Sequence, residues 1–373
     1  MRSEPLRVAL VVGSMVRGGA EKQLLYWARA LRDSSAEVQL YALTRGEPFE
    51  ADVRNAGFSP VWIGERHGRA KRISALRAEA RRFRPHIVQS THFFANLYAA
   101  TTALGTRALS VGTLRSDGTL EQSENGRWTP WLARAPHGLI ANSSAGCRAA
   151  LALGADPARV QMVANAIDVA QFDELASFAD LRAAPASGDV TMLAVGRLIA
   201  AKRFDIWLRV LSRARQAVPG LRGVLIGDGP LRGDLSRQAA ELGLLPDGLE
   251  MLGERSDVPA QLGKADIYVS SSDHEGFPNV VLEAMTAGLP VVATAAGGTV
   301  DVVRDGHTGF HVAVGDERAL VDRVLQLAKS PELRRRLGSA GRQQVIDQSG
   351  LETLGQRLRE AYRCIARGKR IPV

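Results

Sequence analysis

The stretch EGFPNVVLE, residues 275–283, carries the clearest structural signal in this chain. The run DIYVS at 266–270 precedes it and predicts a strand, because it is short, largely apolar and bounded by polar residues. A polar loop follows, and the apolar residues after Pro278 predict the start of a helix. Pro278 fits the first helical position, where a missing amide hydrogen breaks no helical hydrogen bond. The stretch therefore predicts a strand–loop–helix unit of an α/β fold.

The polar groups of the same turn indicate a ligand. The amides of Asn279 and Val280 are predicted to point outward, unpaired, from the positive end of the helix, and such ends bind phosphate. Glu275 precedes the helix and Glu283 lies on its second turn, so two carboxylates bracket the predicted anion site. This arrangement predicts a ligand with both a phosphate and hydroxyl groups. The alternative is a plain strand–loop–helix with two solvated glutamates.

Strand-like and helix-like segments alternate through the whole sequence. Short apolar runs bounded by turn residues are followed by helically patterned segments, which predicts parallel sheets covered by helices. The linker-like composition of residues 183–188, AAPASG, separates two series of such units. We therefore predict an N-terminal α/β domain at 1–172, a linker at 173–189 and a C-terminal α/β domain at 190–350.

Size and composition set further limits. A chain of 373 residues with 45% hydrophobic residues can build two cores. No apolar run reaches the roughly 18 residues of a transmembrane helix, and the run 8–12 is too short for a signal peptide, so we expect a cytoplasmic protein. Cys147 and Cys364 lie far apart without metal-ligand spacing, so neither a disulfide framework nor a zinc site is expected.

The charge balance is strongly basic. A formal net charge of +9 is compatible with nucleic acid, an acidic membrane surface or phosphorylated substrates as partners. No basic stretch with interleaved aromatic residues and no known nucleic-acid-binding module occurs, so no nucleic acid is expected as a partner.

One basic segment, Arg66–Arg84, concentrates this charge. It contains eight arginines and lysines and a single acid, Glu79. Its apolar residues recur at roughly helical spacing among the basic ones, and an amphipathic basic helix can lie on an anionic membrane. The alternative is an ordinary helix with its apolar face in the core and a solvated basic face.

The 275–283 stretch continues with Ala284-Met285 and Gly288-x-Pro290, and the whole resembles the signature of the retaining nucleotide-sugar glycosyltransferases of family 4, also called group 1. That signature is a glutamate, seven residues and a second glutamate, followed by Ala-Met. The resemblance implies the GT-B architecture, in which two Rossmann-like, doubly wound α/β domains face an interdomain cleft. It also implies that the segment 351–373 forms a C-terminal helix that packs back on the N-terminal domain.

The resemblance implies a diphosphate site after the predicted strand 190–195. Gly196-Arg197-Leu198 follows this strand, and Lys202 comes five residues after the arginine. A guanidinium and an ammonium can neutralise the charge that develops on a diphosphate leaving group. The family also implies that Glu275 holds hydroxyls of the transferred sugar and that Glu283 holds the ribose. The alternative for the two bases is a solvated surface.

Further donor contacts are implied by the resemblance alone. Gly18 and Gly19 follow the first predicted strand, where glycine lets backbone amides approach a phosphate. Gly229 lies in a Gly-x-Gly-Pro turn, which fits a tight structural turn equally well. Arg255 belongs to a segment expected beside the nucleotide base. The complete implied donor set is Gly18, Gly19, Gly196, Gly229, Arg255, Phe277, Asn279, Val280 and Glu283.

His92 is the candidate catalytic residue in the first domain. It follows the predicted strand 87–90, where members of the family often have a histidine near the transferred sugar. The resemblance implies a hydrogen bond from His92 to a sugar hydroxyl as the anomeric centre becomes cationic. The alternative is a packed loop residue beside Phe93 and Phe94.

No Asp-x-Asp motif occurs in the chain, and such motifs commonly present a metal to a nucleotide diphosphate. We therefore expect a metal-independent reaction with no cofactor, and the resemblance implies a front-face transfer that retains the anomeric configuration. The implied donor is a nucleotide-sugar, with UDP preferred, and the implied acceptor is a glycan or a polyprenyl-lipid-linked glycan of a cell-surface polysaccharide. Peripheral contact with the inner face of the plasma membrane would follow. The rival functions are a sugar-nucleotide epimerase, a phosphorylase with pyridoxal phosphate and a non-catalytic sugar-nucleotide-binding protein.

Overall fold

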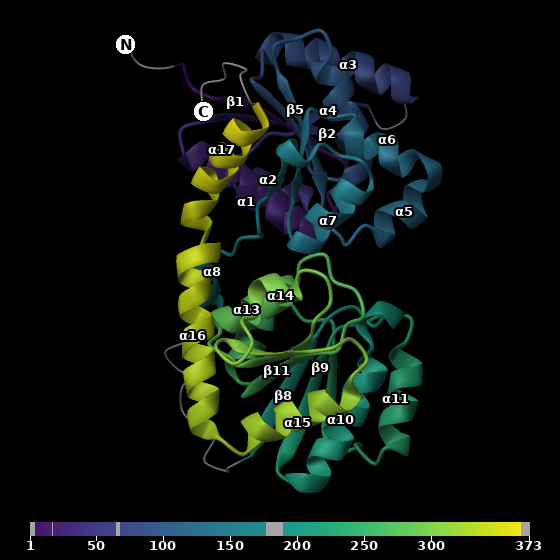
Figure 1. The fold of residues 1–373 in the computed structure, drawn as a ribbon, viewed down its shortest axis with the longest axis vertical. Helices are drawn as coiled ribbons and strands as arrows, with labels where there is room; N and C mark the ends of the chain where they lie inside the picture. Colours follow the sequence, from purple (N-terminus) through teal and green to yellow (C-terminus); the bar gives the residue numbers. More distant parts are fainter. Residues whose placement is uncertain (1–3, 17, 65–67, 177–188, 367–373) are drawn as a thin grey trace. The chain divides into compact units, whose positions relative to one another are not determined.

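The computed structural model describes residues 4–16, 18–64, 68–176 and 189–366, and Figure 1 shows their helices and strands. The chain divides into two compact units. The first unit runs to Ala166 and includes the segment from Leu351, while the second unit runs from Ile167 to Gly350. The chain thus leaves the first unit ahead of the predicted limit at residue 172.

Seven parallel strands form the sheet of the first unit, in the order β3-β2-β1-β4-β5-β6-β7. Strands β4 and β5 are buried along their whole length, as expected for a parallel sheet that helices cover on both faces. The strands are β1 (Arg7–Val12), β2 (Glu37–Ala42), β3 (Val61–Trp62), β4 (Ile87–Ser90), β5 (Leu109–Leu114), β6 (Gly138–Ala141) and β7 (Val160–Met162).

Helices connect these strands and cover the sheet. The first of them, α1 (Gly19–Asp33), buries Trp27 and Leu31 at helical spacing in the core of the unit. The others are α2 (Glu50–Asn55), α3 (Arg69–Phe83), α4 (Asn96–Ala103), α5 (Thr119–Asn125), α6 (Thr129–Arg134) and α7 (Ser144–Ala152), with short 3-10 turns η1 (Phe93–Ala95), η2 (Gly126–Trp128) and η3 (Pro157–Arg159).

The helix α17 (Leu351–Ala366), yellow in Figure 1, belongs to the first unit. Leu354, Leu358 and Tyr362 recur at helical spacing and are buried in the same core as the residues of α1. The hydroxyl of Tyr362 donates a hydrogen bond to the side-chain oxygen of Gln89 in β4. Residues 367–373 of the predicted C-terminal region lie outside the described residues.

Six parallel strands form the sheet of the second unit, in the order β10-β9-β8-β11-β12-β13. They are β8 (Val190–Val195), β9 (Leu221–Ile226), β10 (Leu249–Gly253), β11 (Ile267–Ser270), β12 (Val291–Thr294) and β13 (Gly309–Val312). Both sheets are entirely parallel with helical connections. The prediction of two Rossmann-like, doubly wound α/β domains is therefore confirmed.

The second unit also contains the helix α8 (Val169–Ala176), which precedes most of the predicted linker. Asp173 of α8 accepts a bidentate ion pair from Arg342 of α16, so the first residues of the predicted linker 173–189 are helical and held by the unit. Residues 177–188 lie outside the described part. The other helices are α10 (Phe204–Ala217), α11 (Arg232–Glu241), α12 (Val258–Gly263), α13 (Asn279–Thr286), α14 (Thr299–Val302), α15 (Glu317–Ala328) and α16 (Pro331–Ser349), with the 3-10 turn η4 (Ala200–Lys202).

The helix α3 covers most of the basic segment Arg66–Arg84, whose residue 66 lies outside the described part. Leu76 and Ala80 of α3 are buried, and Ile73 and Phe83 are partly buried against the same cluster. The large apolar residues of this helix therefore lie against the core of the first unit, and the charged side chains that it exposes are Arg69, Lys71, Arg81 and Arg82. The packing matches the alternative of an ordinary helix with its apolar face in the core, while contact of its basic face with a membrane stays a prediction.

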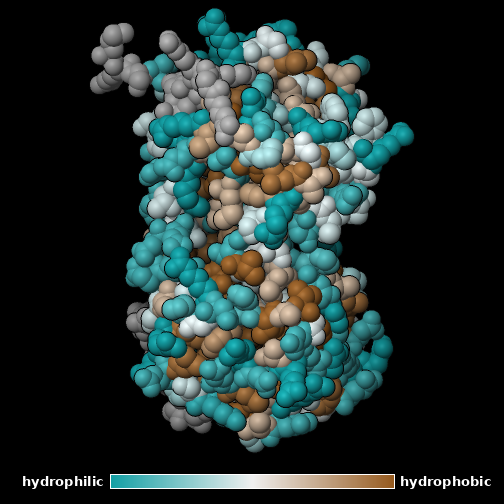
Figure 2. All heavy atoms as spheres, in the orientation of Figure 1, coloured by the Kyte–Doolittle hydropathy of each residue, from teal (hydrophilic) through white to brown (hydrophobic). Residues whose placement is uncertain are grey.

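The surface is otherwise typical of a globular α/β protein. On the face drawn in Figure 2, hydrophilic residues predominate and apolar residues appear between them in small groups. None of the helices in residues 4–16, 18–64, 68–176 and 189–366 combines the length and apolar character that a membrane span requires.

Candidate active site

The sheet of the second unit has its topological switch point between β8 and β11. From β8 the chain builds the sheet outward through β9 to β10, and from β11 it builds the other half outward through β12 to β13. The connections after β8 and β11 therefore run to opposite sides of the sheet centre and leave a crevice between them. Open α/β sheets bind ligands in the crevice at such a point, beyond the carboxyl ends of the strands. Lys202 follows β8 and Glu275 follows β11, so this topology brings together two predicted catalytic residues from distant parts of the sequence.

Lys202 and Glu275 form an ion pair at the switch point. The Nζ of Lys202 donates to Oε1 of Glu275 at 2.5 Å, and the two side chains are 26% and 11% exposed. Ser272 donates a second hydrogen bond to the same oxygen at 2.7 Å. Within the described part of the chain, no donor contacts the other oxygen, Oε2. Oε2 of Glu275 can therefore accept a hydrogen bond from a ligand, and the remaining N–H groups of Lys202 can donate to one.

Arg203 ties the loop after β8 to the loop after β11. Its Nη1 contacts both carboxylate oxygens of Asp273 at 3.0 and 3.3 Å, while Nε and Nη2 donate to Asp205 at 3.0 and 3.1 Å. The hydrogen bonds to Asp205 and Asp273 raise the pKa of Arg203 further above its usual value. These contacts fix the backbone beside Lys202, although nothing in the sequence singles out Arg203 or Asp273.

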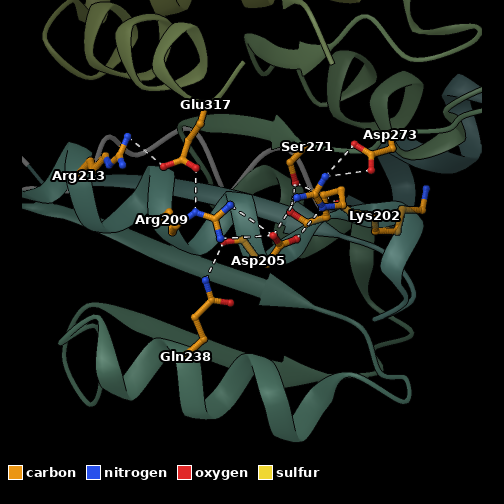
Figure 3. A network of polar contacts seen from close by, with 9 residues as sticks. Lys202, Asp205, Arg209, Arg213, Gln238, Ser271, Asp273 and Glu317 are labelled. Carbon is orange, nitrogen blue, oxygen red and sulfur yellow. Dashed lines mark hydrogen bonds and ion pairs between the residues drawn. The ribbon is translucent and has the colours of Figure 1, made fainter. Parts of the chain in front are cut away.

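Two further sets of contacts hold the same loops. The hydroxyl of Ser271 donates to the carbonyl oxygens of Lys202 and Arg203 at 3.0 and 2.8 Å. The ion-pair network continues along α10 through Asp205 and Arg209 to Glu317 at the start of α15, as Figure 3 shows. The backbone of Lys202 is thus held by hydrogen bonds from the loop after β11 and, through its neighbour Arg203, by the ion-pair network of α10 and α15.

Gly297 and Gly298, after β12, hold the backbone of Glu275 from the other side. Gly297 has a φ of +51°, and a Cβ added there would lie 1.6 Å from the carbonyl oxygen of Glu275. The amide of Gly298 donates to that same oxygen at 3.3 Å. Only glycine permits both the left-handed conformation and this approach. Gly297 and Gly298 therefore fix the backbone of Glu275, and with it the position of the Glu275 carboxylate.

Arg197 is exposed and follows β8 after one residue, Gly196. No side chain in the described residues forms a hydrogen bond or an ion pair with it, so its guanidinium is available to a ligand. Gly196 beside it has room for a side chain, since an added Cβ would come no closer than 3.4 Å to Phe204. Conformational restriction therefore does not require glycine at position 196.

Gly229 packs against the loop that carries Arg197. An added Cβ at Gly229 would lie 2.6 Å from the carbonyl oxygen of Leu198, and one at Gly227, where φ is +137°, would lie 1.9 Å from that of Gly196. The amide of Leu198 donates to the carbonyl of Asp228 at 2.9 Å. This geometry matches the alternative in which Gly229 belongs to a tight structural turn. The turn packs against the loop of Arg197 and so shapes it.

The start of α13 differs from the prediction in two ways. The helix begins at Asn279, so Pro278 precedes it and does not occupy its first position. The amide of Asn279 donates to the carbonyl of Phe277 at 3.0 Å and is not unpaired as predicted. The first helical hydrogen bond runs from Leu282 to Pro278, so Val280 precedes the helical ladder and its amide has no acceptor within the helix. One of the two predicted phosphate-binding amides therefore remains.

Phe277 and Glu283 flank this helix start. Phe277 is buried, with 8% of its surface exposed, so its side chain packs in the fold, and Glu283 is partly exposed on α13. Tyr268 in β11 is buried nearby, and its burial, together with the charges of Glu275 and Glu283, raises its pKa. Tyr268 therefore stays neutral beside the two carboxylates.

Arg255 lies beyond β10, the edge strand of the second sheet. It forms a bidentate pair with Asp257 at 2.7 and 2.8 Å, and both side chains are exposed. Two strands, β9 and β8, separate β10 from β11, so the sheet order places Arg255 at the periphery of this edge and not beside the Lys202–Glu275 pair.

The first unit has its own switch point, between β1 and β4, and His92 follows β4 there. The Nδ1 of His92 faces the amide of Gly13 at 3.3 Å, and its Nε2 faces Oε1 of Glu21 at 3.3 Å. Since an amide can only donate, Nδ1 is the acceptor and Nε2 carries the proton that Glu21 accepts. Ser14 donates to the same carboxylate oxygen at 3.2 Å. Both ring nitrogens of His92 therefore have protein partners.

Glu21 was not singled out from the sequence, and only its position after Gly18-Gly19 could have drawn notice. Its side chain is 5% exposed. Burial by itself raises the pKa of Glu21, but the hydrogen bonds from His92, its own backbone amide and Ser14 outweigh it and lower the pKa below the usual value. The carboxylate is therefore ionised at neutral pH beside His92.

Arg115, after β5, is a second residue that sequence reasoning missed. Its Nη2 donates to Oδ1 of Asn165 at 2.9 Å, and its guanidinium lies 5.1 Å from the ring centre of Trp27. Burial lowers the pKa of Arg115 to about 10, an effect that the charge of Glu21 partly opposes. Glu21 thus has a cationic neighbour as well as a histidine.

Gly18 and Gly19 lie at the start of α1 and are exposed. Gly18 has an extended backbone, and an added Cβ would lie 2.7 Å from Oε2 of Glu21. A side chain at position 18 would therefore disturb the carboxylate that contacts His92. Residue 17 lies outside the described residues.

Substitution of Glu21 by glutamine should remove part of the pH dependence of stability. A carboxylate with a lowered pKa stabilises the fold above its ordinary value of 4.5, and this contribution is lost as the pH falls through the lowered value. Glu21→Gln is expected to lower the free energy of unfolding at pH 7 by about 1–3 kcal/mol. Urea unfolding at pH 7 and at pH 3 should show a smaller difference between wild type and variant at the acidic pH. Glu352→Gln, at an exposed position of the same unit, is the control, and an equal loss at both pH values would contradict the assignment.

Over the described ranges, with the gaps at 17, 65–67 and 177–188, no three His, Cys, Asp or Glu side chains gather in a way that could hold a metal ion.

Two family profiles match the chain. The profile described as "Glycosyl transferases group 1" matches residues 180–344, and the one described as "Glycosyltransferase Family 4" matches residues 17–171. The first covers the second unit with its Lys202–Glu275 pair, and the second covers the unit that contains His92. Together the profiles span most of the sequence.

Curated relatives match parts of the chain. The lipopolysaccharide core biosynthesis glycosyltransferase LpsE of Rhizobium meliloti is 32% identical over 170 residues, which are 46% of this chain and 48% of the relative. The GDP-mannose-dependent alpha-(1-6)-phosphatidylinositol monomannoside mannosyltransferase of Mycolicibacterium smegmatis is 32% identical over 177 residues, 45% of this chain and 46% of the relative. The matched part spans about half the length of these relatives.

Solved structures match over nearly the full length. The crystal structure of HepE from Anabaena, in complex with UDP and glucose, aligns with a TM-score of 0.80 at 20% identity and covers 96% of this chain and 99% of that chain. At this identity the likeness shows the fold, which is GT-B as predicted. The two profiles and the fold agree, and the chain belongs to the group 1 glycosyltransferases of family 4.

Proposed function

We propose that this chain is a retaining, metal-independent glycosyltransferase. It transfers a sugar from a nucleotide-sugar, preferably a UDP-sugar, to a glycan or polyprenyl-lipid-linked acceptor during synthesis of a cell-surface polysaccharide. The observation that carries the proposal is the Lys202–Glu275 pair at the switch point of the second sheet, with the exposed Arg197 on the adjoining loop.

The two cations supply the stabilisation of the leaving group. Lys202 shares one donor with Glu275 and keeps others for a phosphate oxygen, and Arg197 has no competing partner among the described side chains. Negative charge grows on the diphosphate as the glycosidic bond breaks, so both cations bind the transition state more tightly than the ground state. This is the role that a metal ion plays in enzymes that use one, which supports a metal-independent reaction.

The carboxylates bind hydroxyl groups of the donor. Glu275 offers Oε2 to the transferred sugar, because Oε1 already accepts bonds from Lys202 and Ser272. Glu283, on the next helical turn, binds the ribose. A double displacement needs a carboxylate free to attack the anomeric carbon, and the pairing of Glu275 with Lys202 makes it a poor nucleophile. This supports a front-face transfer, in which the leaving phosphate helps to deprotonate the acceptor.

The remaining predicted residues take supporting roles in the proposal. The amide of Val280 binds a phosphate oxygen at the start of α13, while Gly229 shapes the loop of Arg197, to which Gly196 belongs. His92 acts together with Glu21, which accepts the hydrogen bond from Nε2 and so fixes the orientation of the ring beside the transferred sugar.

The choice of donor and acceptor rests on the relatives. The name of the Rhizobium relative refers to lipopolysaccharide core biosynthesis, and HepE was solved with UDP, which supports a UDP-sugar and a surface glycan. The mycobacterial relative is named for GDP-mannose, so the GDP-sugars are the first competitors to test.

The basic segment supports contact with an anionic membrane by charge alone. Lys71, Arg81 and Arg82 of α3 are exposed, while its apolar side faces the core. Each basic residue near an anionic surface contributes about 1 kcal/mol, so this face can hold the chain near the membrane without insertion.

Nucleotide release from a panel of UDP-, GDP- and ADP-sugars tests the proposal, with EDTA throughout and with or without a membrane-lipid extract. The expected result is release of one nucleotide that lipid stimulates and EDTA leaves unchanged, with an α-linked product from an α-linked donor. Release without any glycosylated product would instead indicate an epimerase, and donor binding without release would indicate a binding protein. Loss of release with EDTA would contradict metal independence.

A further inference from the structure

The residue directly after Lys202 has a strained backbone conformation. Arg203 has a φ of +48° and a ψ of +43°, in the left-handed region that glycine adopts freely and that a Cβ disfavours. Among the non-glycine residues that the structure describes, only Ser35 and Arg84 also have a positive φ, and both lie at the end of a long helix, where this conformation is common. Arg203 instead lies between the 3-10 turn η4 and the start of α10. A residue persists in this region only when its surroundings fix it there.

The side chain of Arg203 makes the contacts that fix it. Its Nε and Nη2 donate to the carboxylate of Asp205, and its Nη1 contacts both oxygens of Asp273 (Figure 3). The carbonyl of Arg203 also accepts hydrogen bonds from the Ser271 hydroxyl at 2.8 Å and from the amide of Ile206 at 3.0 Å. We call Arg203, Asp205 and Asp273 the arginine clamp.

The arginine clamp joins the same two connections as the ion pair of the candidate site, and it does so next to that pair. Arg203 adjoins Lys202 in the connection after β8. Asp273 precedes Glu275 by two residues in the connection after β11, and its amide donates to the carbonyl of Ala201 at 2.9 Å. Any shift between the two connections would therefore change the 2.5 Å contact of the pair.

The alternative role for Arg203 is direct contact with a ligand phosphate, as proposed for Arg197. All three nitrogens of the Arg203 guanidinium already contact a carboxylate, and two aspartates surround its single charge. A diphosphate would have to displace one of these aspartates, and it would approach the other against like charge. The contacts therefore favour a link between two protein segments over a contact with the donor.

We infer that Arg203 is a positioning residue of the transferase, which acts through its contact with Asp273 to place Lys202. This role rests on the proposed function of Lys202 at the leaving group and adds a residue that acts through it. Glycine at position 203 would adopt the same backbone freely but would hold no carboxylate. Arginine exchanges that freedom for a fixed link between the two connections. Displacement of a catalytic group by about 1 Å can lower turnover about a hundredfold, so a fixed link at this point affects the rate directly.

Arg203→Gly should separate turnover from stability. Glycine relieves the left-handed strain, and the ion pairs that are lost are partly exposed, so the urea unfolding midpoint should stay close to that of wild type. Turnover with the donor that the nucleotide-sugar panel identifies should fall about tenfold, because the clamp no longer holds Lys202. The donor KM should change by less than about threefold, since the charge on the leaving group is largest in the transition state.

Two double variants test whether Arg203 acts through its neighbours. In a Lys202→Ala background, Arg203→Gly should cause no further loss of turnover, because the group that it positions is absent. Asp273→Ala alone should lower the unfolding midpoint as well as turnover, since the strained arginine loses one of its supports. Addition of Arg203→Gly to Asp273→Ala should restore the midpoint but not the turnover.

Ser35→Gly and Arg237→Ala are the matched controls. Ser35 is an exposed residue of the first unit with a φ of +65°, so its substitution relieves left-handed strain away from the site. Arg237 forms an exposed ion pair with Asp234 at 3.3 Å in the second unit, so its substitution removes an arginine–aspartate pair on another helix. Both variants should keep the turnover of wild type.

The outcomes distinguish this role from the proposed function. Normal turnover in Arg203→Gly, beside a large loss in Lys202→Ala, would overturn the positioning role and leave the proposed function intact. Normal turnover in Lys202→Ala would remove both. A further loss from Arg203→Gly in the Lys202→Ala background would show that Arg203 acts independently, and an unfolding midpoint that falls together with turnover would show a merely structural role; either result overturns the positioning role.

Discussion

Lys202→Ala is expected to lower turnover on the order of a hundredfold, as the loss of one donor to a developing anion does in other enzymes. In the proposed mechanism the substitution removes a cation from the leaving group, and it leaves the largely buried Glu275 without its 2.5 Å partner. The variant should therefore also be less stable, by about 1–3 kcal/mol. Steady-state release of nucleotide at saturating donor, together with urea unfolding, measures both effects.

Arg197→Ala should separate the loss of turnover from the loss of stability that are both expected for Lys202→Ala. Arg197 forms no hydrogen bond or ion pair with another side chain of the described residues, so its removal should lower turnover on the order of a hundredfold while the unfolding midpoint stays at the wild-type value. Lys264→Ala, at an exposed lysine of the same unit, is the control for charge and should change neither quantity. Turnover within about threefold of wild type in both active-site variants would remove the two cations from the mechanism.

Gly297→Ala is expected to have the largest effect on the architecture of the site. The added methyl group would lie 1.6 Å from the carbonyl oxygen of Glu275, and the φ of +51° adds strain for any residue with a Cβ. The loop that carries Glu275 must move, which should lower the free energy of unfolding by about 2–4 kcal/mol. Displacement of a catalytic group by about 1 Å can lower turnover about a hundredfold, and we expect a loss of this size.

Gly315→Ala is the matched control for this variant. Its φ is +81°, in the same left-handed region, but an added Cβ meets no atom within 4 Å. The control should therefore show only the conformational strain of about 1 kcal/mol and near-normal turnover. If both glycine variants behave alike, the close approach to Glu275 does not position the carboxylate. A crystal structure of Gly297→Ala should show the 275–277 turn shifted.

The fold could be predicted from the sequence because its signals are local. The strands around 190–195 and 266–270 and the helix after 278 follow from the spacing of apolar residues along a few turns of chain. Lys202 and Glu275 could be proposed from their motifs in the same way. The exact ends of helices are harder to predict. Pro278 lies one residue before α13, and the amide of Asn279 donates a hydrogen bond to the carbonyl of Phe277, because a tight turn forms just before the helix begins.

The partners of the site residues were decided by the tertiary structure. Lys202 and Glu275 are 73 positions apart, and His92 and Glu21 are 71 apart. Each pair meets because two strands distant in sequence are neighbours in a sheet, and strand order depends on how all the crossovers pack together. No pattern within one segment encodes that order.

The same distinction applies to the surfaces. The alternation of basic and apolar residues in α3 allowed either a membrane face or a core face, and packing against the first unit placed Leu76 and Ala80 in the core. Trp128 of η2 and Trp131 of α6 look equally suited to a core, but Leu132 and Ala133 are the buried residues of this segment and both indoles stay exposed. The sequence alone determined which segments are strands and helices and which motifs carry charge; only the tertiary structure decided which face is buried and which side chains meet, because burial is settled by neighbours from elsewhere in the chain.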